Sequence, residues 1–148
     1  MNVRKMAVGW LDRLQNQDSE EFARLFSVDG LYVDPAFGLV RRGRDFVKLH
    51  HRRWHAAVPD FRCKAERVLV EGRTATIQYE AEGTFSGESL GAGERIILPT
   101  HQSFRARGLI VLDYDESGQV ISCTEYYDRS IMPCGEKPPF DDDVIGLR

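Results

Sequence analysis

The sequence contains no long apolar run and few cysteines, and both absences narrow the class of protein. The longest apolar stretches, such as residues 109–112, are far too short to cross a bilayer as a helix. The three cysteines, Cys63, Cys123 and Cys134, are odd in number and widely spaced. This usage argues against a disulfide framework and against a structural zinc site, and it favours a reducing cytoplasm.

Basic residues are not concentrated anywhere in the chain. The net charge is −3 with both signs mixed, and no basic stripe or nucleic-acid-binding aromatic motif occurs, so nucleic-acid binding is not expected. The segment after Met1 is polar and helix-like and has no signal-peptide apolar core. The 148 residues, 42% apolar and 29% charged, are typical of one globular domain with a substantial core.

Helical periodicity dominates the first part of the chain. Apolar residues recur at three- and four-residue steps over 6–14 and 22–26, which predicts two helices separated by a short break. A short strand is expected over 31–34. The next apolar face predicts a third helix over 43–57, which Pro59 ends.

Alternation of apolar and polar residues marks the second part. The predicted strands cover residues 61–70, 74–82, 103–114 and 120–128. Helices followed by an antiparallel meander indicate an α+β protein whose long strands curl around the helices. The domain is expected to span 1–132, and the proline-, glycine- and aspartate-rich residues 133–148 are expected to form an irregular C-terminal tail.

Five short motifs follow one another along the chain. They are Asp29–Pro35, Gly43–Asp45, Val58–Asp60, Gly83–Gly87, and Gly118–Val120 followed by Glu125–Asp128. In this order they resemble the SnoaL-like domains of the nuclear transport factor 2-like superfamily, over roughly residues 5–130. The resemblance implies a cone-shaped α+β barrel, with three N-terminal helices packed on a curved antiparallel sheet around an apolar pocket.

This fold hosts several activities, so the resemblance leaves the function open. Its members include polyketide cyclases, limonene-type epoxide hydrolases, epoxide-opening ether cyclases, ketosteroid isomerases and non-catalytic domains. The first hypothesis is a cofactor-free acid/base cyclase of a small apolar polyketide- or terpenoid-type intermediate, acting by epoxide opening in one version. The alternatives are a non-catalytic ligand-binding or assembly module, and a ketosteroid-isomerase-like isomerase or epoxide hydrolase. The resemblance also implies a homodimer.

The main candidate for acid/base chemistry is Glu125. It shares one face of the last predicted strand with Ile121, Cys123 and Tyr127, and that face joins the apolar interior of this fold. Desolvation there is expected to raise the pKa of Glu125 and make it a general acid or base. By resemblance, related hydrolases and cyclases keep their pocket carboxylate here. The alternative is an edge residue whose carboxylate reaches solvent or an arginine.

Tyr32 and Asp34 lie two residues apart on a strand and therefore point the same way. The resemblance places them at the Tyr and Asn of the epoxide hydrolase pocket, so Asp34 adds a second acid. Two carboxylates in one cavity can hold different protonation states. The alternatives are core packing for Tyr32, and for Asp34 an Asx-type turn or a salt link to a nearby arginine.

The central strand departs from the epoxide hydrolase pattern. Those enzymes carry an Arg and an Asp two residues apart where this chain has Tyr79 and Ala81. Neither residue supplies that charge pair, so simple addition of water to an epoxide is not expected. Tyr79 and Tyr32 are expected to hold a substrate oxygen while Glu125 moves a proton.

The remaining candidates lie around the expected pocket. His101 is a candidate proton relay at its mouth, with an ordinary loop histidine as the alternative. The predicted substrate-binding residues are Trp54, Phe37, Phe85, Tyr127 and Cys123. The histidines at 50, 51 and 55 are expected on a solvated helix surface rather than in a metal site, and no cofactor is expected. The arginines at 41–44 are expected in a solvated turn, able to hold an acidic group of a substrate.

Overall fold

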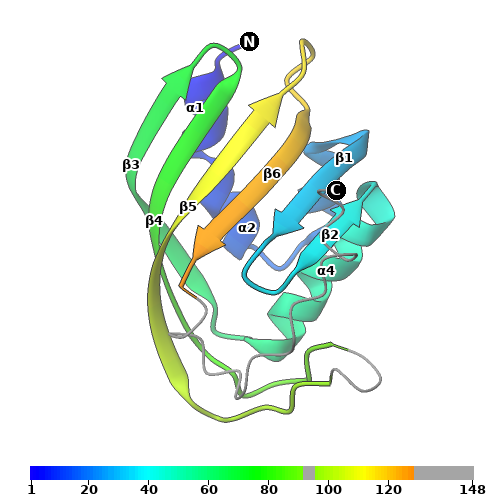
Figure 1. Cartoon of the computed structure of the whole chain (residues 1–148), viewed down its shortest axis with the longest axis vertical. Helices are drawn as coiled ribbons and strands as arrows, with labels where there is room; N and C mark the ends of the chain where they lie inside the picture. Colours follow the sequence, from blue (N-terminus) through cyan, green and yellow to red (C-terminus); the bar gives the residue numbers. More distant parts are fainter. Residues whose placement is uncertain (92–95, 129–148) are drawn as a thin grey trace.

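The computed structural model describes residues 1–91 and 96–128, so the predicted tail at 133–148 lies outside the described residues. The helices of this part are α1 (Val3–Val8), α2 (Trp10–Gln15), α3 (Ser19–Arg24) and α4 (Arg44–Ala57). The strands are β1 (Phe26–Asp34), β2 (Leu39–Arg42), β3 (Arg62–Glu71), β4 (Thr74–Thr84), β5 (Ser103–Tyr114) and β6 (Val120–Tyr127). In Figure 1 the sheet curls in front of the helices.

The N-terminal helices bury their apolar sides against the concave face of the sheet. The predicted first helix is divided at Gly9, which is both the C-cap of α1 and the N-cap of α2. Asp18 begins α3 because its side chain accepts a hydrogen bond from the backbone N–H of Glu21. Trp10 and Phe22 meet at a ring distance of 5.2 Å inside the core. The α+β architecture predicted from the sequence is therefore confirmed.

The sheet is open and mixed, with strand order β2-β1-β6-β5-β4-β3. β1 and β6 pair in parallel, whereas the other neighbouring strands pair antiparallel. The antiparallel sheet predicted from the sequence is therefore wrong for the β1–β6 pair. Hairpin turns between consecutive strands can be recognised in a sequence, whereas a pairing of distant strands cannot. A parallel pair requires a crossover, which here includes α4 and strands β3 to β5. This pairing sets the first and last strands side by side and so brings their polar residues together.

The strand alternation predicted for β4 is confirmed. Ala75, Ile77, Tyr79 and Ala81 are all buried, and the residues between them are half-buried. β4 pairs with β5 along its whole length without a register shift. The apolar face of these two strands therefore forms a continuous wall of the interior.

The first residues of β6 depart from the expected alternation of inward- and outward-facing side chains. Val120 pairs with Tyr114, but Ser122 pairs with Asp113, so one extra residue lies between them on β6. Val120 is consequently buried and Ile121, predicted to face the interior, is 44% exposed. A bulge of one residue reverses the side on which the preceding side chains lie. Beyond it, Cys123 is buried as expected.

A strand that the sequence analysis missed, β2, lies at one edge of the sheet. It follows a turn in which Gly38 has a φ of 65°, and it pairs antiparallel with β1. Arg41 lies opposite Tyr32 in this pairing. The solvated turn expected for residues 41–44 is therefore wrong for Arg41, which burial desolvates.

The histidines of α4 correct a second expectation. His51 and His55 are buried, at 2% and 7% exposure, instead of lying on the helix surface. The Nε2 atoms of both rings lie 2.9 and 2.8 Å from the Leu14 carbonyl oxygen, and His51 Nδ1 lies 2.6 Å from the Ser19 hydroxyl. These bonds fasten α4 to α2 and α3. They satisfy both ring nitrogens of His51 and the Nε2 atom of His55, whereas the buried Nδ1 atom of His55 has no hydrogen-bond partner.

These rings should make the fold sensitive to acid. Burial lowers the pKa of His51 to about 4. The stabilisation is fully present above the unfolded value of roughly 6.5, and it is lost as pH falls from there toward 4. Between pH 7 and pH 5 the free energy of unfolding should fall by about 2 kcal/mol for His51 alone.

Urea unfolding of the wild type and of His51→Gln at both pH values measures this effect. The variant should lose about that part of the pH dependence, while the dependence due to the other histidines remains. An identical pH dependence in the two proteins contradicts the assignment.

Candidate functional site

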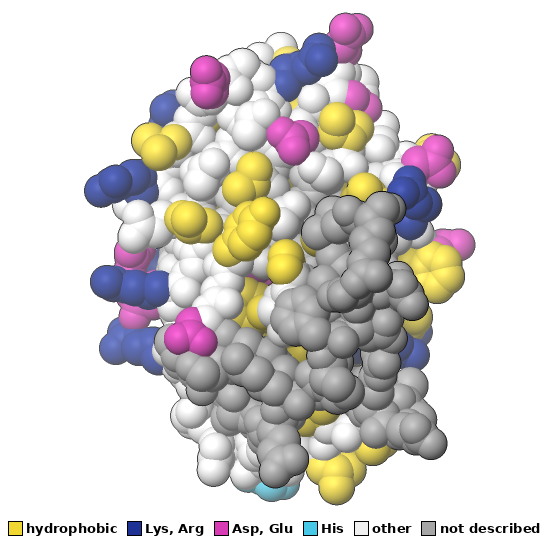
Figure 2. All heavy atoms as spheres, viewed as in Figure 1, with side chains coloured by type: hydrophobic (Ala, Val, Ile, Leu, Met, Phe, Trp, Pro, Cys, Tyr) yellow, Lys and Arg dark blue, Asp and Glu magenta, His cyan; other side chains and the backbone are white. Residues whose placement is uncertain are grey.

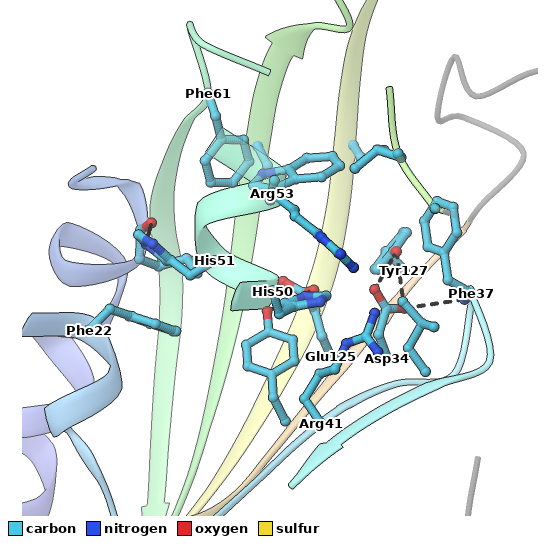
Figure 3. A pocket seen from close by; sticks show the side chains of 18 of the residues that line it. Phe22, Asp34, Phe37, Arg41, His50, His51, Arg53, Phe61, Glu125 and Tyr127 are labelled. Carbon is cyan, nitrogen blue, oxygen red and sulfur yellow. Dashed lines mark hydrogen bonds between the residues drawn. The ribbon is translucent and has the colours of Figure 1, made fainter. Parts of the chain in front are cut away.

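A cavity of about 310 Å³ opens between the concave face of the sheet and α4. Its size is within the range of small-molecule sites. Most of its wall is apolar and aromatic: Leu14, Phe22, Phe37, Leu39, Trp54, Phe61, Ala81, Leu90, Ile97, Phe104 and Ala106. The polar side chains that reach it come from β1, β2, β4, β6 and α4 (Figure 3). Polar groups in such a wall are candidates for chemistry because few waters compete with them.

Glu125 enters the cavity from β6. The Tyr32 hydroxyl donates a hydrogen bond to its Oε2 at 3.1 Å. Burial, together with the charge of Asp34, raises the pKa of Glu125 to about 8, against the opposing hydrogen bonds of Tyr32 and Tyr79. Glu125 is therefore mostly protonated at neutral pH and is placed to donate a proton.

Asp34 lies at the end of β1 and is 5% exposed. The Tyr127 hydroxyl lies 3.1 and 2.9 Å from its two carboxylate oxygens, and the Phe37 backbone N–H donates to Oδ1 at 3.3 Å. Donors of this kind favour the ionised form of a carboxylate. The two acids of the cavity thus have different surroundings. Glu125 lies beside Tyr32 in apolar space, whereas Asp34 accepts hydrogen bonds from the Tyr127 hydroxyl and the Phe37 N–H.

The two phenols beside Glu125 stay neutral. Burial, with the charge of Glu125, raises the pKa of Tyr32 and of Tyr79 far above the ordinary value. Both hydroxyls therefore remain hydrogen-bond donors over the whole working range of pH. They are able to hold a substrate oxygen while it gains or loses charge.

Gly108, which the sequence analysis did not single out, makes room for one of these phenols. It lies opposite Tyr79 in the β4–β5 pairing. A Cβ atom at this position would lie 2.6 Å from the Tyr79 hydroxyl oxygen and 2.5 Å from the Tyr126 carbonyl oxygen. Glycine inside a strand often marks such a close approach, and this signal was available in the sequence.

The cavity brings together most of the site residues predicted from the sequence. Those that line it are Tyr32, Asp34, Phe37, Trp54, Tyr79, Glu125 and Tyr127. Their placement agrees with the predicted pocket, and their roles in catalysis stay a prediction.

Three predicted residues do not line the cavity. His101 is an exposed loop residue with a φ of 58°, and its N–H bonds the Phe85 carbonyl oxygen at 2.9 Å. It therefore matches the alternative of an ordinary loop histidine. Phe85 and Cys123 are fully buried in the core behind the cavity wall. Core packing therefore encloses both side chains and keeps them out of contact with a ligand in the cavity.

His50 and Arg53 line the cavity but were not predicted to do so. Arg41 was predicted in a solvated turn, with contact to an acidic group of a substrate as the alternative, and it lines the cavity. The signal for His50 was its position four residues before Trp54, on the same helix face. Burial, with the positive charges of Arg41 and Arg53, lowers the pKa of His50 to about 3, so its ring is neutral. The ring packs on Tyr32 at a centroid distance of 4.5 Å.

Neither a cluster of metal-ligating side chains nor a helix able to span a membrane occurs among the described residues. Within residues 1–91 and 96–128, no group of His, Cys, Asp and Glu side chains is arranged to hold a metal ion. In the same residues no helix combines the length and the apolar character needed to cross a bilayer. The chemistry that the described side chains do supply is proton transfer between oxygen atoms inside an apolar cavity.

Solved structures share the fold over nearly the whole chain. One is a protein with a ketosteroid isomerase-like fold from Catenulispora acidiphila DSM 44928, in complex with trimethylamine. It is 19% identical to this chain with a TM-score of 0.73, and the match covers 90% of this chain and 94% of that one. Another, named as a SnoaL-like polyketide cyclase from Jannaschia sp. CCS1, is 17% identical with a TM-score of 0.76 and 93% coverage of both chains.

A third similar structure is the epoxide hydrolase/cyclase-like enzyme SalBIII, with a role in pyran ring formation in the polyether salinomycin. It is 13% identical, with a TM-score of 0.70, covering 87% of this chain and 92% of that one. Identities this low establish the fold and leave the activity open.

The sequence comparisons agree with the motif order. None of the curated proteins compared with the chain matches it. The family model of the SnoaL-like polyketide cyclase matches residues 5–132, which include every strand and helix described above except the first two residues of α1. The resemblance inferred from the five motifs is thereby confirmed, and the chain belongs to the SnoaL-like polyketide cyclase family.

Proposed function

We propose that the protein is a cofactor-free cyclase that closes a ring by acid-assisted opening of an epoxide in a small, mainly apolar molecule. The observation that carries the proposal is the neutral carboxyl group of Glu125, with its pKa raised to about 8, beside phenol donors in an apolar cavity. A neutral acid in apolar surroundings protonates an oxygen that becomes negative during reaction.

The proposed step is balanced within the substrate and the two acids. A hydroxyl oxygen of the substrate bonds to one epoxide carbon, and the bond between that carbon and the epoxide oxygen breaks. Glu125 gives its proton to the departing oxygen, and Asp34 accepts the proton of the attacking hydroxyl. Tyr79 donates a hydrogen bond to the departing oxygen, and the cavity confines the chain near its reactive geometry. Solvent then returns the proton from Asp34 to Glu125.

Three further observations favour ring closure over hydrolysis. Tyr79 and Ala81 both line the cavity where related epoxide hydrolases carry the Arg and Asp that activate water, so this pair is replaced. A relative of the same fold is an epoxide hydrolase/cyclase-like enzyme of pyran ring formation. The aromatic wall also suits a folded organic chain better than an ordered water.

The experiment is to incubate the wild type with a phenyl-substituted epoxy alcohol whose hydroxyl reaches either epoxide carbon, in isotopically labelled water. A cyclase accelerates formation of an unlabelled cyclic ether, whereas a hydrolase yields a labelled diol. A protein that binds the compound in the cavity without accelerating either reaction is a binding module, and the proposal is then wrong.

The same groups favour a second candidate, a proton shift in an enone. A neutral acid beside a phenol stabilises an enolate oxygen, and Asp34 lines the same cavity as a possible base. An isomerase would exchange deuterium from solvent into the carbon next to the carbonyl of an apolar cyclic enone. The proposed cyclase leaves that position unlabelled, so mass spectrometry distinguishes the two.

We also propose that the outer face of the sheet forms a homodimer contact. Figure 2 shows hydrophobic side chains gathered on this face. Leu109 and Tyr126 are exposed and directly opposite each other on β5 and β6, and Ile121 is exposed nearby on β6. Burial of such side chains would drive association of two sheets.

Leu109→Lys should therefore convert a dimer into a monomer in sedimentation equilibrium. Phe46→Lys, at an exposed apolar position on α4 away from the outer face of the sheet, is the control and should leave the dimer intact. A monomeric wild type, or a dimer that Leu109→Lys does not affect, contradicts this contact.

A further inference from the structure

Near the acids, the described lining of the cavity carries an excess of positive charge. Arg41 from β2 and Arg53 from α4 line it together with Asp34, Glu125 and His50 (Figure 3). At neutral pH Glu125 is mostly protonated and His50 is neutral, so among the described lining residues two positive charges face one negative charge. Arg53 is exposed, whereas Arg41 is half-buried, and a half-buried charge that is not fully compensated costs free energy.

The guanidinium of Arg41 has an unused donor. Its Nε atom is buried and has no hydrogen-bond partner in the structure. Burial and the charge of Arg53 lower the pKa of Arg41, against the weaker effect of Asp34. Among the ion pairs of the described residues, none includes Arg41 or Arg53. A buried donor without a partner, next to a second cation, indicates a missing anionic group.

We propose that Arg41 and Arg53 bind a carboxylate of the substrate, which is therefore an apolar organic acid. A guanidinium presents parallel N–H donors that match the two oxygens of a carboxylate. The apolar body of such a molecule fits against Trp54, Phe61 and Phe104, which line the same cavity. That this acid is the substrate, rather than only a ligand, rests on the proposed function.

A single negative charge fits the cavity better than a double one. The excess of the described lining is one positive charge, and a phosphate dianion would also face Asp34, whose charge already acts on Arg41. The binding point is close to the chemistry, because Arg41 lies opposite Tyr32 in the β1–β2 pairing and Tyr32 bonds Glu125. A carboxylate held there would orient the remainder of the molecule along the wall that carries the acid.

The test compares naphthylacetate with naphthylacetamide by isothermal titration calorimetry at pH 7 and low salt. The two probes share shape and apolar area and differ in charge. The acid should bind about tenfold more tightly than the amide, and this preference should weaken as salt is added. Arg41→Gln and Arg53→Gln should each reduce the affinity for the acid about tenfold and leave the affinity for the amide unchanged.

Matched controls are available on the same elements. Arg42 and Arg52 adjoin the two subsite residues in sequence but, unlike Arg41 and Arg53, do not line the cavity. Arg42→Gln and Arg52→Gln should keep the preference for the acid, and thermal unfolding checks that all four variants are folded. Equal affinity for the two probes, absence of binding by either, or equal losses in the control variants would overturn the proposal.

The outcome is separable from that of the proposed reaction. Glu125→Gln removes the proton donor but not the arginines, so it should keep the preference for naphthylacetate. A protein that prefers the acid yet closes no ring supports the carboxylate subsite and contradicts only the cyclase. A protein that closes the ring of the epoxy alcohol but binds acid and amide equally contradicts only the subsite.

Discussion

Replacing Glu125 by glutamine is expected to reduce turnover of the epoxy alcohol by about 10²- to 10⁴-fold with an unchanged dissociation constant. The affinity should survive because the wild-type side chain is mostly protonated at neutral pH, since its pKa is raised to about 8. Glutamine has the same size and the same zero charge, and its oxygen can still accept the Tyr32 hydrogen bond. What glutamine lacks is a proton that it can give away.

Steady-state kinetics and calorimetry on the same preparation separate the two effects. Glu82→Gln is the matched control, because Glu82 lies on the outer face of β4 and pairs with Arg62 near the surface. It should leave both turnover and affinity at the wild-type level. Full activity in Glu125→Gln would falsify the role of Glu125 as the acid, and a parallel loss of affinity and turnover would assign it to binding alone.

The strands that carry this acid were accessible to sequence reasoning because their signal is local. Alternation over β4 and β5 fixes which side chains face inward, and β5 was predicted with its observed bounds, Ser103–Tyr114. On β6 the same period of two correctly placed Glu125 and Tyr127 on one inward face. A regular strand in a sheet buried on one face leaves little freedom of register.

Other parts of the site were beyond such reasoning because they depend on distant partners. Ile121 faces outward only because an extra residue enters β6 opposite β5. His51 is buried because two groups more than 30 positions earlier in the chain complete its hydrogen bonds. The Leu14 carbonyl accepts from Nε2–H, and the Ser19 hydroxyl donates to Nδ1 of the neutral ring. Arg41 reaches the cavity through β2, a strand of four residues that exists because β1 pairs with it.

The polar residues that the sequence analysis misplaced lie on apolar faces, as do the groups proposed for catalysis. Hydropathy patterns do not predict such residues in a core, because their burial depends on hydrogen-bond partners from other elements. A polar group of the cavity wall whose hydrogen bonds remain incomplete is available to a ligand. The hydrogen bonds of the His51 ring are complete, whereas those of Arg41 are not.

The titration of Glu125 is the second large effect expected. Carbon NMR of the side-chain carboxyl should find a pKa near 8, where an unperturbed glutamate titrates near 4.5. Because the proposed reaction needs the protonated form, the rate of ring closure should fall tenfold for each pH unit above that value. At lower pH, between 4.5 and 8, the fold loses stability as pH rises, because the raised folded pKa of Glu125 gives a contribution that is lost across that interval.

Two variants should move this pKa in opposite directions, which separates its causes. Tyr32→Phe removes a hydrogen bond that favours the ionised carboxylate, so the pKa should rise further. Asp34→Asn removes a neighbouring negative charge, so the pKa should fall, and NMR rather than kinetics must measure it because Asp34 is the proposed base. Burial alone would leave the pKa of both variants at the wild-type value. Opposite shifts would instead identify Asp34 as the charge that keeps Glu125 protonated, and Tyr32 as the donor that limits the rise.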